Sequence, residues 1–404
     1  NAFETFRNQN ALMYAAGVNQ PDIVDLLLAH GAKNINVRAK SDDWPRQMTS
    51  EPRAQFSSRQ AGGLTALLYA TRSGCYRCAV ALVKAGAEVD RPNPDGVTPL
   101  INALDNKRFD IAMFLIDQGA NVHVWDMSGR TPLYVAVDMN SFRGGGGFGG
   151  GANGPGGAGR GGAEPVAVPA TPGAPVVTAM QVVNRLIGMG VDVNHQLTRK
   201  RPYGAGRGRF QDYDMRGGVG PLFVASMNHD HEAMQVLLAH GAEVDLPNVF
   251  QMTPLMMAAG MIGTGRVAGG GAPGGAPTGD AQARAIKTID LLLDAGANIN
   301  AQVTDSHTHT AVLMAYLAGR DQEGRTALFA AAEGGRDRVV QHLLERGADP
   351  AIRDAAGKTA LDAVRAVPAV AGAAAAAPAA AGRTATVALL EAVTPRSGAA
   401  APAK

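Results

Sequence analysis

Short stretches of apolar residues recur along the chain at the spacing of amphipathic helices. In one stretch, Leu100 and Ala103 lie on the same side of a short first helix. Ile111, Phe114 and Leu115 follow at the i, i+3, i+4 spacing of the buried face of a second helix. Neither helix is long enough to be stable alone. The pattern therefore predicts helix pairs that bury their apolar faces against neighbouring pairs.

The pattern has a fixed period. Residues 97–121, 219–243 and 325–349 match position for position, and an anchor residue before each first helix recurs every 33 residues where the pattern is uninterrupted. In each intact copy a glycine follows the anchor by 21 residues, as Gly119 follows Thr98. A fixed period near 33 residues indicates a stack of repeated helix pairs. The eight anchors are Asn10, Thr65, Thr98, Thr131, Gly220, Thr253, Thr326 and Thr359.

Local chemistry predicts where each helix begins and ends. Thr98 precedes Pro99, and a residue before proline favours an extended backbone. This conformation suits an N-cap, whose hydroxyl accepts a hydrogen bond from a backbone N–H of the first turn. Pro99 then occupies the first helical position, where its missing N–H is harmless. Gly119 falls where a left-handed backbone closes the second helix, and glycine adopts that conformation without a steric penalty.

The recurring motif resembles the ankyrin repeat. It consists of T-P-L-x-x-A, a helix pair ending in L-L-x-x-G-A before Asp, Asn or Glu, and a turn with D-x-x-G. The resemblance implies an all-α ankyrin-repeat solenoid, in which helix-turn-helix pairs are joined by β-hairpin fingers. It also implies protein binding on the concave face that fingers and first helices line. The family's histidine after T-P-L is absent from all eight units, so we expect apolar contacts to replace the polar ones between first helices.

We interpret residues 1–404 as a single array. The expected units lie near residues 3–63, 64–96, 97–129, 130–218, 219–251, 252–324, 325–357 and 358–395, with a tail at 396–404.

Three segments interrupt the helix pairs and are expected to be flexible. Residues 143–175 and 263–281 are rich in glycine, alanine and proline, and residues 366–383 are largely alanine. Such segments bury too little apolar surface to offset the entropy of ordering. The array tolerates them because the entropy of loop closure grows slowly with loop length.

Three other insertions lengthen the fingers, at residues 37–63, 196–218 and 301–324. They carry aromatic and arginine side chains, which are enriched in binding hot spots. The alternative is that these aromatic side chains fold back and tether each long finger. The candidate partner-binding residues are Trp44, Phe56, Arg199, Lys200, Arg201, Tyr203, Arg207, Arg209, Phe210, Tyr213 and Tyr316.

The composition argues against several classes of protein. The chain has 37 basic and 35 acidic residues, and its net charge of +2 disfavours a dominant attraction to nucleic acid or membranes. No apolar run is long enough to span a membrane. The chain begins at Asn1 with no visible signal peptide, which leaves the compartment open and allows a processed periplasmic or secreted protein. The abundance of Gly, Ala and Arg is typical of a bacterial genome.

Cys75 and Cys78 form a Cys-x-x-Cys motif that invites a redox or metal interpretation. Zinc requires two more ligands, and none lies nearby in the sequence. Ala79 follows the motif where haem attachment needs histidine. Cys78 occupies the core position held by Ile111 in the next unit. We therefore expect a buried Cys78 and a partly exposed Cys75.

The sequence favours a non-catalytic scaffold that binds another protein, alone or as a subunit of a larger assembly. It assigns no catalytic residue, no metal ligand and no cofactor. The histidines at 229–231 and 307–309 lack a nucleophile and a paired carboxylate with a partner base. The alternative function is nucleic-acid binding through the Arg-Gly segments at Arg160 and Arg207, which the near-neutral charge disfavours.

Overall fold

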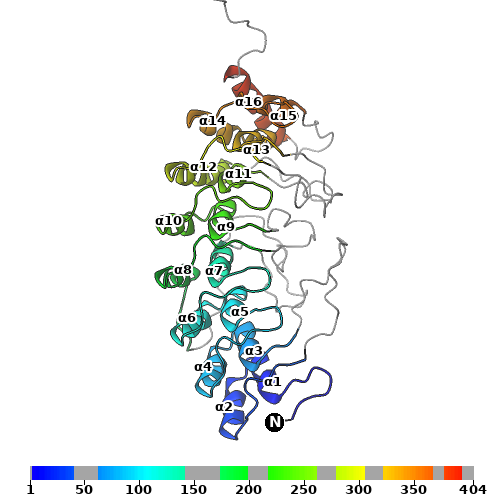
Figure 1. The fold of residues 1–404 in the computed structure, drawn as a ribbon, viewed down its shortest axis with the longest axis vertical. Helices are drawn as coiled ribbons and strands as arrows, with labels where there is room; N and C mark the ends of the chain where they lie inside the picture. The colour runs from blue at the N-terminus through cyan, green and yellow to red at the C-terminus, as the bar shows by residue number, and fades with distance from the viewer. Residues whose placement is uncertain are drawn as a thin grey trace, which may run out of the picture. The chain divides into compact units, whose positions relative to one another are not determined.

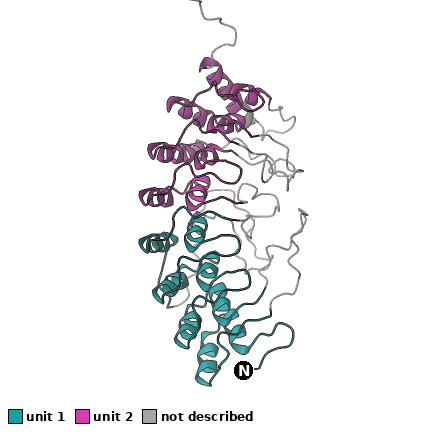
Figure 2. Ribbon diagram, in the orientation of Figure 1, with its two compact units in different colours: residues 1–209 teal, residues 210–404 magenta. Residues whose placement is uncertain are grey.

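The computed structural model describes residues 2–40, 62–141, 173–198, 217–261, 279–304, 322–366 and 377–393. The chain divides into two compact units, residues 1–209 and 210–404, and each is described by itself (Figure 2). All named elements in these ranges are α-helices, and Phe3 and Asn10 form an isolated antiparallel β-bridge. The predicted all-α class is confirmed.

The first unit contains four helix pairs in its described residues. The helices are α1 (Ala11–Gly17), α2 (Pro21–Ala29), α3 (Ala66–Ser73), α4 (Tyr76–Lys84), α5 (Pro99–Asp105), α6 (Phe109–Asp117), α7 (Pro132–Ser141) and α8 (Ala179–Gly188). The first helices contact one another in the order α1, α3, α5, α7, and the second helices form another row, α2, α4, α6, α8 (Figure 1). Each first helix also packs on its own second helix, so the core lies between the two rows.

The second unit repeats this arrangement. Its described helices are α9 (Pro221–Asn228), α10 (His231–Ala239), α11 (Pro254–Ala259), α12 (Gly279–Asp294), α13 (Ala327–Glu333), α14 (Asp337–Glu345), α15 (Ala360–Ala366) and α16 (Ala377–Val393). Odd-numbered helices contact one another in one row and even-numbered helices in the other (Figure 1).

The predicted helix boundaries are confirmed at α5 and α6. Thr98 is extended, its hydroxyl accepts a hydrogen bond from the Ile101 N–H at 3.3 Å, and Pro99 is the first helical residue. Gly119 follows the end of α6 with a φ of +84°. The same hydroxyl cap recurs at Thr65, Thr131, Thr253 and Thr359.

The predicted apolar faces form the core. Leu100, Ile111 and Leu115 are fully buried, and burying such a side chain contributes about 1.5–3 kcal/mol. Phe114 differs from the prediction, because it is only half-buried. Its ring meets Tyr76 of α4 edge-on, with the ring centroids 5.8 Å apart, so it packs at the rim of the core.

Polar side chains do connect the first helices, contrary to the expectation of purely apolar contacts. Asn102 of α5 donates to the Leu68 carbonyl at 2.9 Å and to the Thr71 hydroxyl at 2.7 Å, both in α3. The Ser73 hydroxyl of α3 donates to the Ala16 carbonyl of α1 at 2.7 Å. Asparagine and serine at other helical positions thus replace the missing histidine, because buried carbonyls still require donors.

Each ordinary finger closes with a tight turn rather than a β-hairpin. The Asn93 side-chain oxygen accepts from the Asp95 and Val97 N–H groups at 3.0 and 2.9 Å. The same arrangement recurs at Asp126, Asn248 and Asp354. Within the described residues these fingers contain no strand. The chain enters the next helix directly after the turn, so there is no room for a ladder of backbone bonds.

Neighbouring fingertips are joined through their backbones. The Met127 N–H donates to the Asp95 carbonyl of the preceding finger at 2.9 Å. Equivalent bonds of 2.9 to 3.1 Å run from Thr198 to Ser128, Val249 to Gly217 and Ala355 to Glu323. The approach is so close that a Cβ atom on Gly129 would lie 2.6 Å from the Thr198 nitrogen. Glycine is therefore required at this fingertip for space as well as for its φ of +80°.

The described ends of two long fingers close where an ordinary finger closes. The Ala39 N–H donates to the Leu64 carbonyl at 2.9 Å, and the Val303 N–H donates to the Arg325 carbonyl at 3.0 Å. These bonds correspond to the one from Asn93 to the Val97 carbonyl in an ordinary finger. Both insertions therefore begin and end at a fingertip.

Two segments expected to be flexible are partly helical. Residues 279–281 begin α12, and residues 377–383 begin α16. Alanine has the highest helix propensity, and Pro378 stands in the first turn of α16, where its missing N–H is harmless. Gly382 permits close packing, because a Cβ there would lie 2.3 Å from the Gly335 carbonyl oxygen.

The cysteine prediction was correct for Cys78 and wrong for Cys75. Both residues are fully buried, and a disulfide joins them. Cys75 is the N-cap of α4, and its sulfur lies 3.2 Å from the Cys78 N–H in the first turn. The N-cap geometry folds the Cys75 side chain back over that turn, which brings the two sulfurs together and removes Cys75 from solvent.

We predict that Gly129→Ala destabilises the first unit more than Gly119→Ala. Both glycines have φ near +80°, so each substitution forces alanine into the left-handed region at about 1–2 kcal/mol. Only Gly129 faces the next finger, and overpacking there adds about 1–3 kcal/mol, since nothing lies within 4 Å of a Cβ on Gly119. Urea unfolding followed by circular dichroism measures both, and equal losses would contradict the packing argument.

We also predict no free thiol in the oxidised protein. Alkylation of the unfolded chain should add no mass without reductant and two adducts after reduction, because both cysteines are in the disulfide. Mass spectrometry of the intact chain makes the measurement. Alkylation without reductant would show that the disulfide is absent.

Candidate binding surface

The eleven candidate residues from the long fingers all lie outside the described residues. They belong to residues 41–61, 199–216 and 305–321. They stay predictions: Trp44, Phe56, Arg199, Lys200, Arg201, Tyr203, Arg207, Arg209, Phe210, Tyr213 and Tyr316.

The described part of the first unit places another set of side chains on the fingertips. Arg38, Pro92, Trp125 and Gln196 occupy the same position in four successive fingers. We call these four residues the fingertip row. The Arg38 guanidinium donates to the Pro92 carbonyl. The backbone bonds between fingers hold the later members, so the row is a fixed part of the stack.

Trp125 gives the fingertip row an exposed aromatic surface. Its side chain is 58% exposed, and Met127 on the same fingertip is 38% exposed. The ring of His195, on the next finger, lies 5.4 Å from the Trp125 ring at an interplanar angle of 31°. We call Trp125, Met127 and His195 the Trp125 patch. Aromatic residues and methionine are enriched where proteins bind one another.

Trp125 is not among the residues predicted from the sequence, because those residues were chosen from the long fingers. A signal was present in the repeat alignment. The same position holds Arg38, Pro92 and Gln196 in neighbouring units, and a position that accepts arginine and glutamine is rarely in a core. A tryptophan at such a position is expected to face solvent.

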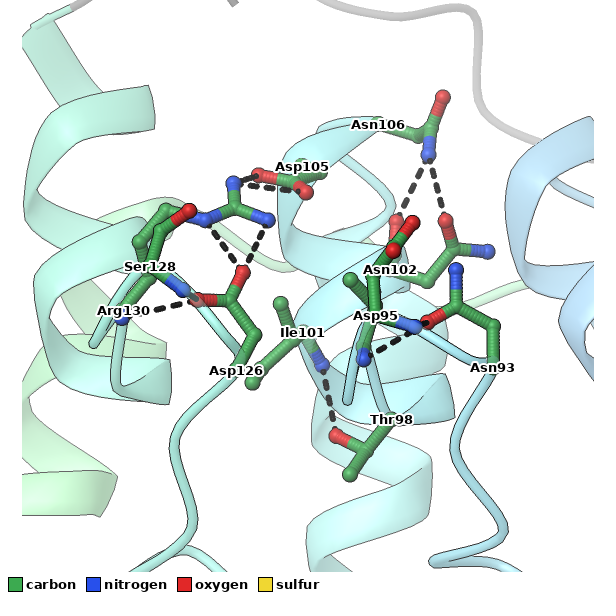
Figure 3. Close-up of polar contacts among 11 residues, drawn as sticks. Asn93, Asp95, Thr98, Ile101, Asn102, Asp105, Asn106, Asp126, Ser128 and Arg130 are labelled. Atoms are coloured by element: carbon green, nitrogen blue, oxygen red, sulfur yellow. Dashed lines mark hydrogen bonds and ion pairs between the residues drawn. The ribbon is translucent and has the colours of Figure 1, made fainter. Parts of the chain in front are cut away.

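A buried ion network joins the turn of this finger to α5 (Figure 3). Asp126, next to Trp125, accepts from the backbone N–H groups of Ser128 and Arg130 at 2.9 and 3.0 Å. The Arg130 guanidinium lies 2.6 Å from the Asp126 carboxylate and 2.7 Å from that of Asp105 in α5. Arg130 is only 1% exposed. The fingertip that carries Trp125 is thus tied to α5 by charged groups shielded from water.

His229, the C-cap of α9, and His231, the first residue of α10, make structural contacts. His229 Nδ1 lies 2.9 Å and His231 Nε2 lies 3.0 Å from the hydroxyl of Thr288 in α12. Burial lowers the pKa of His231, which favours its neutral form. Among the described residues, no group of three or more His, Cys, Asp or Glu side chains is placed to hold a metal ion.

Three further features considered in the sequence are the second histidine pair, the Arg-Gly segments and a membrane-spanning run. His307, His309 and the Arg-Gly segments at Arg160 and Arg207 lie outside the described ranges. None of the helices in those ranges has both the length and the apolar character that crossing a membrane requires.

Two family models of ankyrin repeats match parts of the chain. The family described as ankyrin repeats (3 copies) matches residues 1–93 and 67–143, and that described as ankyrin repeats (many copies) matches residues 317–363. No curated protein matches the chain. Among solved structures, the human ASB11 ankyrin repeat domain is similar over 85% of this chain and 100% of that chain, at 19% identity and a TM-score of 0.49.

We predict that Arg130→Met lowers the free energy of unfolding by about 3–5 kcal/mol, because it leaves two buried carboxylates without their cation. The control is Arg185→Met. Arg185 pairs with Asp117 on the surface, where both side chains are about half exposed, so its loss should be at most about 1 kcal/mol. Denaturant unfolding of the two variants makes the comparison. Similar losses would show that the Arg130 network contributes no more than a surface pair.

Proposed function

Because the chain is an ankyrin-repeat protein, we propose that it is a non-catalytic scaffold that binds another protein through its fingers. Ankyrin repeats generally mediate protein–protein interaction. The observation that carries the proposal is the Trp125 patch, an exposed aromatic surface on a rigid fingertip of the first unit.

The energetics of the patch support a binding role. When a partner covers exposed aromatic surface, each Å² of apolar area removed from water favours binding by about 25 cal/mol. Tryptophan is also among the residues most enriched in binding hot spots. The ion network of Arg130 with Asp105 and Asp126 holds the patch in place before a partner arrives. Less side-chain and backbone entropy is then lost on binding.

The long fingers are proposed to make further contacts with the partner. Two of them are inserted at fingertips, where the described part of the chain closes like an ordinary finger. On this proposal the repeats provide the frame, and residues 41–61, 199–216 and 305–321 add selectivity for the partner.

We predict that Trp125→Ala reduces capture of the native partner at least about ten-fold, as removal of a hot-spot residue does. The measurement is quantitative affinity capture from the source cell, comparing the wild-type chain with the variant. The matched control is Leu26→Ala, because Leu26 is 56% exposed but lies on α2, in the row of second helices. The control should capture the partner like the wild type.

Two outcomes would count against the proposal. Equal capture by wild type and Trp125→Ala would remove the Trp125 patch from the interface. Loss of capture with Leu26→Ala alone would place the interface on the second helices. A third chain, with residues 199–216 replaced by an ordinary turn, separates the contribution of the second long finger from that of Trp125.

A further inference from the structure

The disulfide between Cys75 and Cys78 has no part in the proposed binding function, and the repeat does not require it. The chain contains no other cysteine, so the other helix pairs form without such a bond. In four of them the N-cap of the second helix is a polar residue: Gln20, Arg108, Asp230 and Arg336. A bond between residues three apart also closes a very small loop, which removes less entropy from the unfolded chain than a longer one. The disulfide therefore contributes little to the stability of the stack.

The backbone around Cys75 favours a reduced sulfur. Cys75 is the N-cap of α4, and the Cys78 N–H points at its sulfur from 3.2 Å. A thiolate in that position accepts a charge-assisted hydrogen bond and meets the positive end of the helix dipole. A disulfide sulfur carries no charge and gains neither interaction. Cys-x-x-Cys motifs and helix N-termini are both environments that stabilise thiolates.

Arg108, the N-cap of α6 in the next helix pair, brings a cation to the same turn. Its guanidinium lies so close to Gly74, the residue before Cys75, that a Cβ on Gly74 would overlap it. Its Nη2 donates to the Ser73 carbonyl at 3.5 Å, whereas its Nε is buried without a hydrogen-bond partner. Burial lowers the pKa of Arg108, because its charge is poorly solvated there.

The neighbouring charges leave Arg108 without a close counterion. Arg77, which lies between the two cysteines in the sequence, pairs with Asp22 and Asp25 on the surface at 2.9 and 3.3 Å. Asp110 acts on Arg108 from farther away. In the described part of the chain, no carboxylate lies at ion-pair distance from Arg108. A thiolate one residue from Gly74 would supply the missing negative charge.

We propose that Cys75 and Cys78 form a redox switch, whose reduced state is stabilised by the N-terminus of α4 and by Arg108. A dithiol reduces the pair by exchange. Two electrons and two protons pass from its S–H groups to the two sulfurs, and the dithiol becomes a disulfide. Cys75 then releases its proton to water and remains as a thiolate beside Arg108. Both sulfurs are fully buried, so the exchange takes place while the first turn of α4 is open.

The switch changes a contact between two helix pairs. In the oxidised state the turn before α4 is neutral, and Arg108 meets only backbone and apolar atoms of that turn. In the reduced state the thiolate attracts Arg108, which begins α6 of the next pair. The finger that carries Trp125 follows α6. Reduction thus tightens the stack immediately before this finger.

The test measures the redox equilibrium of the full-length chain. The native protein is equilibrated with mixtures of reduced and oxidised dithiothreitol, quenched with acid, unfolded and alkylated, and its intact mass gives the reduced fraction. The same titration in concentrated urea gives the equilibrium of the unfolded chain. We expect the native chain to be half reduced at a dithiol-to-disulfide ratio at least about ten-fold lower than the unfolded chain. An equal or higher ratio in the native chain would identify a structural disulfide and overturn the proposal.

Three variants test the contribution of Arg108. Arg108→Met should raise the native ratio at least about three-fold, toward that of the unfolded chain. Arg108→Lys should keep most of the wild-type preference, because it keeps the positive charge. Arg77→Met is the matched control and should leave the ratio unchanged, because Arg77 is paired on the surface.

Two results would overturn the role of Arg108: an unchanged ratio in Arg108→Met, or an equal rise in Arg77→Met. Circular dichroism checks that each variant is folded, and none of the variants should change the ratio measured in urea. The comparison of native and unfolded wild-type chain needs no variant, so the proposal stays testable if Arg108→Met fails to fold.

Discussion

Backbone hydrogen bonds between neighbouring fingertips set the register on which each unit of this protein depends. The bond from Met127 to Asp95 forms only if the two chains approach closely, and the fingertip glycine Gly96 leaves the necessary space. Equivalent bonds occur in both units. Because each helix pair is too short to be stable alone, this register also decides which apolar faces meet in the core. The fingertip row inherits its alignment from the same bonds.

Charged and polar groups give the fingers a rigidity that apolar packing alone would not provide. Arg130 joins its fingertip to α5 in the first unit, and Arg325 pairs with Glu333 and Asp354 in the second. Buried ion pairs add little net stability, because desolvation offsets much of the attraction between the charges. Their effect here is to hold each turn in one position. A fingertip held in this way presents its exposed residues with little freedom left to lose on binding.

The same finger therefore has two faces with separate roles. Asp126 is buried and determines the turn, whereas its neighbour Trp125 is exposed and free to contact a partner. Asp126 and Arg130 belong to the buried frame of the turn, and Trp125 lies on its surface. This separation lets binding residues vary while the frame of the repeat is retained, and it also explains how fingertips accept long insertions without disturbing the stack.

The sequence by itself determined the repeat period, the helix pairs, the Thr98 cap and the left-handed Gly119, because each depends on residues close together in the chain. It did not predict the Asn102 bonds to α3, the disulfide burial of Cys75 or the ion network of Arg130. Those contacts join residues from different helices or fold a side chain back over its own turn, so they exist only after packing. The exposure of Trp125 was readable from the alignment of fingers. Its support by the Asp126–Arg130–Asp105 network was decided by the tertiary structure, which alone brings the finger against α5.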